Sequence, residues 1–153
     1  MSRHPSTAEP AVEQVDTRYL ESLVGYNARR ATLVIIDAFL RQMAVFGLRP
    51  VDFSVLSLIA HNPGITSRQL CSTLNIQPPN LVGMINQLQK RELITRKPHP
   101  RDGRAMGLHL TPEGRKMMKQ AEVTASELEE SVTSRLTTIE RATLMKLLRK
   151  IYA

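Results

Sequence analysis

Apolar side chains recur every three or four residues from about Asp16 to Phe46, which predicts one long amphipathic helix. Gly47 follows directly and is a typical helix stop. At a rise of 1.5 Å per residue such a helix would be about 45 Å long, more than a small domain buries by itself. We therefore expect the apolar stripe to pack against another subunit. The stripe consists of Leu20, Leu23, Val24, Ala31, Val34, Ile35, Ala38, Phe39, Met43 and Phe46.

Two short helices joined by a tight turn are predicted between residues 66 and 91. Thr66 and Gln69 form a capping box that opens the first helix. Residues 75–77 form the turn, and residues 78–91 form the second helix, whose apolar positions again recur at spacings of three and four. Those positions are Leu81, Met84, Ile85 and Leu88. Two helices around so short a turn indicate a helix-turn-helix motif.

A β-hairpin with a basic tip is predicted directly after these helices. Residues 93–97 have the pattern of a short strand, and residues 105–111 alternate between apolar and polar positions like a half-buried strand. The face expected to be buried carries Met106, Leu108 and Leu110. The connecting loop, 98–104, contains proline and arginine residues. A hairpin in this place makes the motif a winged helix-turn-helix.

Further helices are predicted on both sides of this lobe. Pro50 is suited to the first position of a helix that precedes the motif. Thr111 caps a helix that runs to about Arg135, and a capping box of Thr137 and Glu140 opens a final helix. The predicted fold class is mainly α with a small β-hairpin wing.

The net charge is +7 and the isoelectric point is about 10.1, which favours a polyanionic partner. Most of the excess of basic over acidic side chains lies in the middle third of the chain. Residues 1–60 carry six basic and six acidic side chains, residues 61–111 carry seven and two, and residues 112–153 carry eight and six. A basic segment in the predicted winged lobe is what contact with phosphates requires.

Composition excludes several classes of protein. A chain with 42% hydrophobic and 23% charged residues is globular. No apolar run approaches the roughly 20 residues that span a bilayer, and the polar residues 1–15 resemble a disordered arm rather than a signal peptide. A single cysteine forms no internal disulfide, so we expect a cytoplasmic protein, associated with the nucleoid if it binds DNA.

The order of elements resembles the MarR (multiple antibiotic resistance regulator) family of winged-helix transcription factors. The most specific stretch, DGRAMGLHLTPEGR at 102–115, is similar to the family's D-x-R wing signature followed by a strand and L-T-P-x-G. The resemblance covers about residues 16–152. It implies a homodimer, with helical dimerisation regions at 16–47 and 112–153 and a DNA-binding lobe at 48–111.

The resemblance also implies which side chains contact double-stranded DNA. The second helix of the motif would enter the major groove with Gln77, Asn80, Val82, Gly83, Asn86 and Gln87. The wing and its flanks would contribute Arg68, Lys97, His99, Arg101 and Arg104. Of these, Arg104 would reach the minor groove, with Asp102 pairing to hold the wing. Many relatives carry Ser or Thr before the prolines and Arg within the second helix, and those places are held here by Gln77, Gly83 and Gln87. Because Asn and Gln read adenine bidentately, we expect an operator richer in A·T.

The sequence gives weaker support for a redox, metal or catalytic site than for the DNA contacts. Cys71 is expected to be a buried structural thiol rather than a redox switch, since it has no second cysteine to pair with. The four histidines lack the spacing of metal ligands, and no catalytic motif is present. We therefore expect neither an enzyme nor a bound metal or cofactor.

The expected function is a homodimeric, ligand-responsive repressor acting on a pseudo-palindromic operator. Its effector would be a small aromatic or acyl carboxylate, with no membrane partner. Tyr26 and Arg30, one helical turn apart, could hold a ligand of this kind, and Phe53 and His109 are further candidates for the pocket. The alternative is a basic architectural or RNA-binding protein without a specific site, although it lacks the stacking aromatic pair and the GXXG loop of RNA-binding modules.

Overall fold

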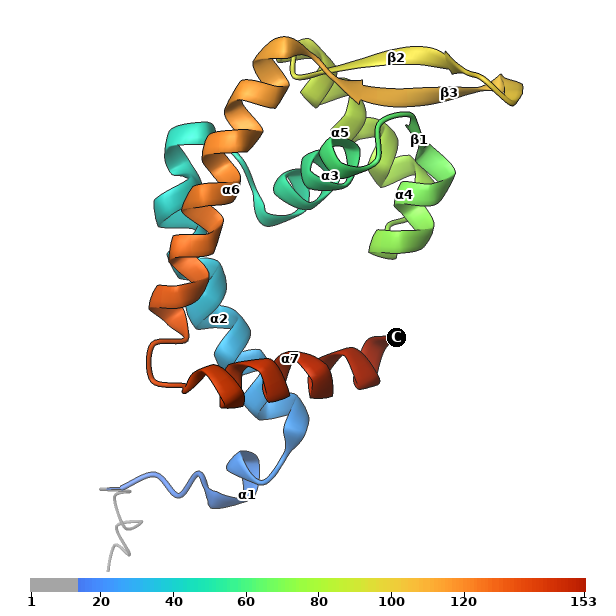
Figure 1. Ribbon diagram of the computed structural model, residues 1–153. Helices are drawn as coiled ribbons and strands as arrows, with labels where there is room; N and C mark the ends of the chain where they lie inside the picture. The colour runs from blue at the N-terminus through green and yellow to red at the C-terminus, as the bar shows by residue number, and fades with distance from the viewer. Residues whose placement is uncertain (1–13) are drawn as a thin grey trace, which may run out of the picture. The chain divides into compact units, whose positions relative to one another are not determined.

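The computed structural model describes residues 14–153, so most of the arm predicted at 1–15 lies outside the described residues. The described chain is mostly helical with one small antiparallel sheet, as the sequence predicts (Figure 1). It divides into a first unit that ends at Leu33 and a second unit, Val34–Ala153. The elements are α1 (Arg18–Glu21), α2 (Val24–Met43), the 3-10 helix η1 (Ala44–Phe46), α3 (Pro50–His61), β1 (Ile65–Thr66), α4 (Ser67–Leu74), α5 (Pro78–Lys90), β2 (Ile94–His99), β3 (Asp102–Leu110), α6 (Pro112–Val132) and α7 (Thr138–Tyr152).

The single long helix predicted over 16–46 is wrong at its N-terminal end. The chain breaks between α1 and α2, where Asn27 Nδ2 donates to the carbonyl oxygens of Glu21 (2.7 Å) and Leu23 (2.8 Å). A side chain that satisfies carbonyls outside the regular helical pattern competes with continuation of the helix. The predicted stop is confirmed, because Gly47 adopts φ +59° after η1.

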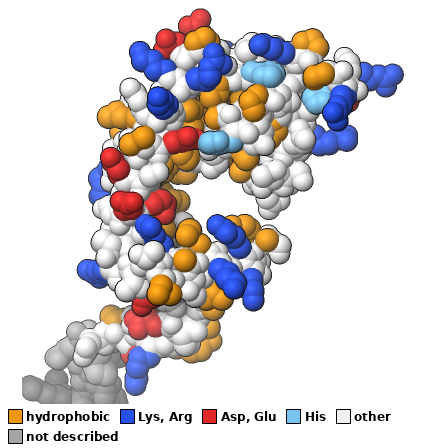
Figure 2. Space-filling model, viewed as in Figure 1, with side chains coloured by type: hydrophobic (Ala, Val, Ile, Leu, Met, Phe, Trp, Pro, Cys, Tyr) orange, Lys and Arg blue, Asp and Glu red, His pale blue; other side chains and the backbone are white. Residues whose placement is uncertain are grey.

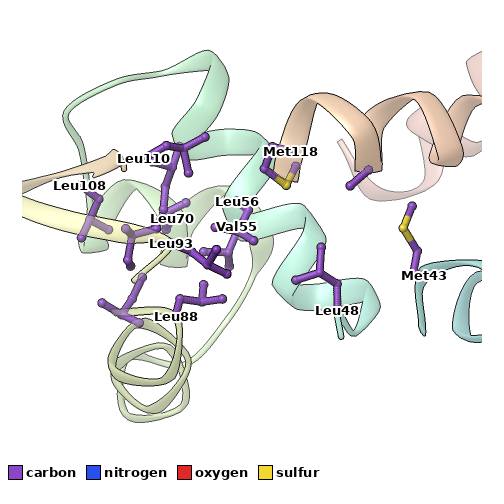
Figure 3. Packing of buried hydrophobic residues seen from close by; sticks show 14 of the residues in the cluster. Met43, Leu48, Val55, Leu56, Leu70, Leu88, Leu93, Leu108, Leu110 and Met118 are labelled. Carbon is purple, nitrogen blue, oxygen red and sulfur yellow. The ribbon is translucent and has the colours of Figure 1, made fainter. Parts of the chain in front are cut away.

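The core of the second unit forms around α3, whose Val55, Leu56 and Ile59 are fully buried. In Figure 3, Leu56, Leu70 and Leu93 lie close together, from α3, α4 and the residue before β2. The inner face of α5 adds three further buried side chains, Leu81, Ile85 and Leu88. This shared core fixes α4 and α5 relative to α3 and thereby sets which face of α5 points outward.

The predicted helix starts are confirmed by their caps. The hydroxyl of Thr66 accepts from the Gln69 backbone N–H at 3.3 Å, and Gln69 Oε1 accepts from the Thr66 backbone N–H at 3.0 Å. Thr137 and Glu140 form the same reciprocal arrangement at the start of α7. These caps satisfy N–H groups that a helix N-terminus otherwise leaves unpaired.

The sheet has the strand order β1-β3-β2, with both pairs antiparallel. The sequence pattern misses β1, a strand of only two residues in which Ile65 lies opposite Leu108. The hairpin is also longer than predicted, because residues expected in the loop continue both strands and leave only 100–101 as the turn. Met106, expected on the buried face, is 45% exposed because the hairpin extends beyond the helices that cover its base (Figure 1).

The base of the hairpin is joined tightly to the start of α6. The Thr111 hydroxyl donates to the Glu92 carbonyl oxygen at 2.6 Å and accepts from the Gly114 backbone N–H at 3.0 Å. A Cβ atom on Gly114 would lie 2.0 Å from the Leu93 carbonyl oxygen, so only glycine fits there. The helix expected to run to about Arg135 ends at Val132.

Within residues 14–153, no single helix is long and apolar enough to cross a membrane. Only the bent pair of helices Val24–Phe46 and Pro50–His61, taken together, has the length and the apolar composition of a membrane span.

Cys71 is partly rather than fully buried, which corrects the prediction of a buried thiol. It packs at the edge of the core on α4, next to the fully buried Leu70.

Candidate nucleic-acid interface

The outward face of α5 carries the side chains predicted to read DNA. Gln77 is the N-cap of this helix, and Pro78 occupies its first position. The outward positions follow the helical spacing of three and four residues that is opposite to the buried apolar row. All six predicted residues are exposed, namely Gln77, Asn80, Val82, Gly83, Asn86 and Gln87.

This face is polar, uncharged and open. No atom lies within 4 Å of the position that a Cβ on Gly83 would take, and Val82 is 54% exposed. Part of the face borders a shallow pocket of about 470 Å³, lined by residues that include Gln77, Asn80 and Gln87. Amide groups on a helix can hydrogen-bond to base edges in a major groove, and an apolar side chain such as Val82 can contact a thymine methyl group.

The tip of the hairpin places two guanidinium groups in solvent. Arg101 and Arg104 are both exposed, and Lys and Arg side chains gather at this end of the molecule in Figure 2. Asp102 Oδ1 accepts from the Arg104 backbone N–H at 3.1 Å. No ion pair to Asp102 forms within residues 14–153, so in this structure it supports the wing through the backbone rather than by pairing with an arginine side chain.

The remaining predicted contacts lie on separate elements of the same lobe. Arg68 is exposed on α4, and Lys97 is exposed on β2. His99 is half-buried at the end of β2, where its Nδ1 accepts from the Arg101 backbone N–H at 3.3 Å. The His99 ring thus helps to shape the turn that carries Arg101.

Arg96 is not among the predicted DNA contacts, yet its Nη2 donates to Asn86 Oδ1 at 3.0 Å. This contact joins β2 to the outward face of α5 across ten positions of sequence. Arg96 belongs to the basic segment, but its partner depends on how the strand packs beside the helix. No spacing rule within one element could have found it.

Arg49 and Arg91 are cations near α5 that are already engaged within the protein. Arg49 Nε and Nη2 bind the carboxylate of Asp52 at 2.7 and 2.9 Å. Burial raises the pKa of Asp52, but the hydrogen bonds and charge of Arg49, together with the charge of Arg91, outweigh it and hold that pKa below its usual value. Asp52 is therefore an ionised, nearly buried carboxylate at the start of α3.

The four candidate effector residues lie in two separate units. In the first unit, Arg30 Nη1 is 3.4 Å from the Tyr26 hydroxyl, and its guanidinium lies 6.0 Å from the ring centroid. In the second unit, Phe53 stacks edge-on against Phe39 with ring centroids 5.8 Å apart. His109, also in the second unit, lies beside a pocket that Phe53 does not line.

That pocket has a volume of about 220 Å³ and lies between the end of α3, β3 and α6. Arg115, Lys119 and Glu122 line it together with His109. Glu122 Oε1 is also 2.8 Å from Nε2 of His61. Within residues 14–153, no group of three or more His, Cys, Asp or Glu side chains could hold a metal ion.

Comparison with known proteins agrees with this geometry. Residues 46–105 match a family model described as the MarR family. A proposed transcriptional regulatory protein for the hcr operon of Thauera aromatica is 30% identical over 84% of this chain and 78% of its own length. The MarR protein of Salmonella typhimurium is 34% identical over 68% of this chain and 76% of its own length.

Solved structures extend the similarity to the whole fold. The transcriptional repressor CouR bound to a 23-mer DNA duplex is 34% identical, covering 92% of this chain and 100% of that chain with a TM-score of 0.86. CouR bound to p-coumaroyl-CoA is 33% identical, covering 90% and 97% with a TM-score of 0.80. These relatives are regulators of transcription rather than enzymes. The chain belongs to the MarR family of winged-helix transcriptional regulators.

Proposed function

We propose that this protein is a sequence-specific, ligand-responsive repressor that acts as a homodimer on a pseudo-palindromic operator. The observation that carries the proposal is the exposed, uncharged amide face of α5 beside a hairpin with arginines at its tip. Amides on a helix distinguish bases, whereas a purely electrostatic DNA binder needs only cations. The protein would work in the cytoplasm at the nucleoid and has no catalytic role.

Exposed apolar side chains support the homodimer. On α2, Leu33 is 52% exposed and Val34 is 60% exposed, while on α7 Ile151 is 69% exposed. Each helix carries several more such residues, namely Ile35, Ile36 and Leu40 on α2 and Ile139, Leu144, Met145, Leu147, Leu148 and Tyr152 on α7. A monomeric protein rarely leaves patches of this kind in water, and a second copy of the chain would cover them.

The two lobes of such a dimer would bind DNA together. Each α5 would enter a major groove, and Arg104 with Arg101 would follow the adjacent minor groove, where a narrow width concentrates negative potential. Arg68 and Lys97 would contact phosphates. Two α5 helices would have to lie about 34 Å apart, one turn of the duplex, to read both half-sites.

Regulation would follow from that spacing. A ligand that binds more tightly to a dimer with a different spacing lowers DNA affinity by its differential affinity for the two states. The structure of CouR bound to p-coumaroyl-CoA supports the proposal that an aromatic acyl compound is the effector of the present chain. Tyr26 and Arg30 of the first unit are the residues we propose to contact it, and Phe53 and His109 of the second unit are separate candidates.

Binding-site selection from a random duplex library, combined with sedimentation of the free protein, tests the proposal. We expect a dimer at micromolar concentration and an enriched inverted repeat. If the free protein sediments as a monomer and the selection enriches no sequence, the proposal is contradicted and the architectural alternative is favoured. Exchange of Arg30 for Met should leave the enriched site unchanged but abolish release by an aromatic carboxylate or acyl thioester.

A further inference from the structure

The contact between Arg96 and Asn86 bears on which base the protein accepts. Asn86 lies on the outward face of α5, and Arg96 lies on β2 outside the set of side chains expected to read bases. Arg96 Nη2 donates to Asn86 Oδ1 at 3.0 Å, and both side chains are on the exposed side of the lobe. The contact therefore lies where α5 would face DNA.

The chemistry of the two groups fixes the orientation of the amide. A guanidinium has only donors, so its partner on asparagine has to be the carbonyl oxygen and not the amino group. An amide that is free to rotate by 180° can present either its donor or its acceptor to a base. With Oδ1 held by Arg96, Nδ2 is left to point away from β2. Neither hydrogen of Nδ2 has a hydrogen-bond partner within residues 14–153.

We propose that Arg96 is a positioning residue that makes Asn86 lead with its amino group toward the base edge. This inference rests on the proposed function, because it requires α5 to lie in a major groove. A leading donor is accepted by guanine, adenine and thymine, each of which offers an acceptor there. It disfavours cytosine, whose amino group in the major groove is itself a donor. Arg96 thereby sets specificity without touching the base.

The experiment starts with binding-site selection by the wild-type chain and by Asn86→Ala. The base pair whose preference is lost in Asn86→Ala is the pair that Asn86 reads. Duplexes with each of the four bases at that position are then titrated against wild type, Arg96→Met and Lys97→Met. Lys97 is the matched control, because it is the next residue on β2, is exposed and carries the same charge.

We expect the wild type to bind the cytosine duplex about tenfold more weakly than the preferred duplex, the usual effect of one wrong base pair. In Arg96→Met the amide is free to turn its oxygen toward the cytosine amino group, and this ratio should fall below about threefold. In Lys97→Met the ratio should stay at the wild-type value while all four affinities fall together. Because each ratio compares duplexes on one protein sample, partial unfolding of a variant cancels.

A double variant completes the test. If Arg96 acts through Asn86, Arg96→Met should change no base preference in the Asn86→Ala background. The proposal is overturned if Arg96→Met lowers all four affinities equally, as Lys97→Met does, since Arg96 would then be a phosphate contact. It is also overturned if wild type selects a site but Asn86→Ala changes no position in it. Failure of wild type to select any site would instead refute the proposed function.

Discussion

Arg91, the residue that follows α5, donates from Nη1 to the carbonyl oxygen of Gly47 at 2.9 Å. Its Nη2 also donates to the Phe46 carbonyl oxygen at 2.7 Å. These two carbonyls lie at the end of η1, so one side chain ties the C-terminal end of α5 to the segment that follows α2. The C-terminal end of α5, the helix that we propose reads DNA, is therefore held against the segment that follows α2.

Exchange of Arg91 for Met should lower the free energy of unfolding by about 1–2 kcal/mol, because two carbonyls lose a charged donor. Urea denaturation followed by circular dichroism measures the change. The control is Lys90→Met, which removes the same charge from the last residue of α5 and should shift stability by less than about 0.5 kcal/mol. Equal losses in the two variants would show that the charge matters and the contact to Gly47 does not.

Gly83 offers a substitution whose effects on stability and on DNA binding should have opposite signs. Alanine in the interior of a helix is favoured over glycine by about 0.5–1 kcal/mol, and the added Cβ on Gly83 meets no atom within 4 Å. Gly83→Ala should therefore raise the thermal midpoint of the free protein. If DNA lies against this position, the methyl group should weaken operator binding by about tenfold, comparable to a wrong base pair. Unchanged or tighter binding would place the DNA elsewhere.

The carboxylate of Asp52 should make stability depend on pH at the acid end. Its pKa is lower in the folded chain than the value of about 3.9 in an unfolded chain, so its stabilisation is complete above that value. The stabilisation is lost as pH falls through the lower folded pKa. Asp52→Asn should cost about 1–3 kcal/mol at pH 7 and flatten the dependence of stability on pH below about 4. An Asp52→Asn profile parallel to wild type in that range would contradict this role.

Two glycines in or beside the hairpin should respond differently to alanine. Gly114→Ala forces a Cβ to within 2.0 Å of the Leu93 carbonyl oxygen, whereas a Cβ on Gly103 meets no atom within 4 Å. We expect Gly114→Ala to lower the free energy of unfolding by about 2–4 kcal/mol and Gly103→Ala to lie within about 0.5 kcal/mol of wild type. Calorimetry on both proteins measures the difference, and a stable Gly114→Ala would mean that the junction between β2 and α6 adapts.

Local signals in the sequence predicted most of the fold. The capping boxes at Thr66 and Thr137 depend only on residues three positions apart, and both form as predicted. The glycine stop at Gly47 is local in the same way. The amphipathic row of α5 correctly predicted that Leu81, Ile85 and Leu88 are buried, because its period matches the helix, whereas Met84 of the same row is only half-buried.

Features that depend on tertiary contacts could not be predicted from the sequence. β1 is a strand only because Ile65 meets Leu108 of β3, which no pattern over two residues reveals. Met106 alternates correctly with Leu108 but lies beyond the helices that bury the latter. The break before α2 depends on where the Asn27 amide donates. The pairing of Arg96 with Asn86 needs β2 to lie beside α5.

The most direct test of the central claim is fluorescence anisotropy of the full chain on its selected duplex and on a scrambled duplex of equal composition. Both titrations are run at about 50 and 200 mM salt, because phosphate contacts weaken steeply over that range. We expect the selected duplex to bind at least about 10³-fold more tightly at the higher salt. Equal affinities that fall together as salt rises would contradict sequence-specific recognition by α5.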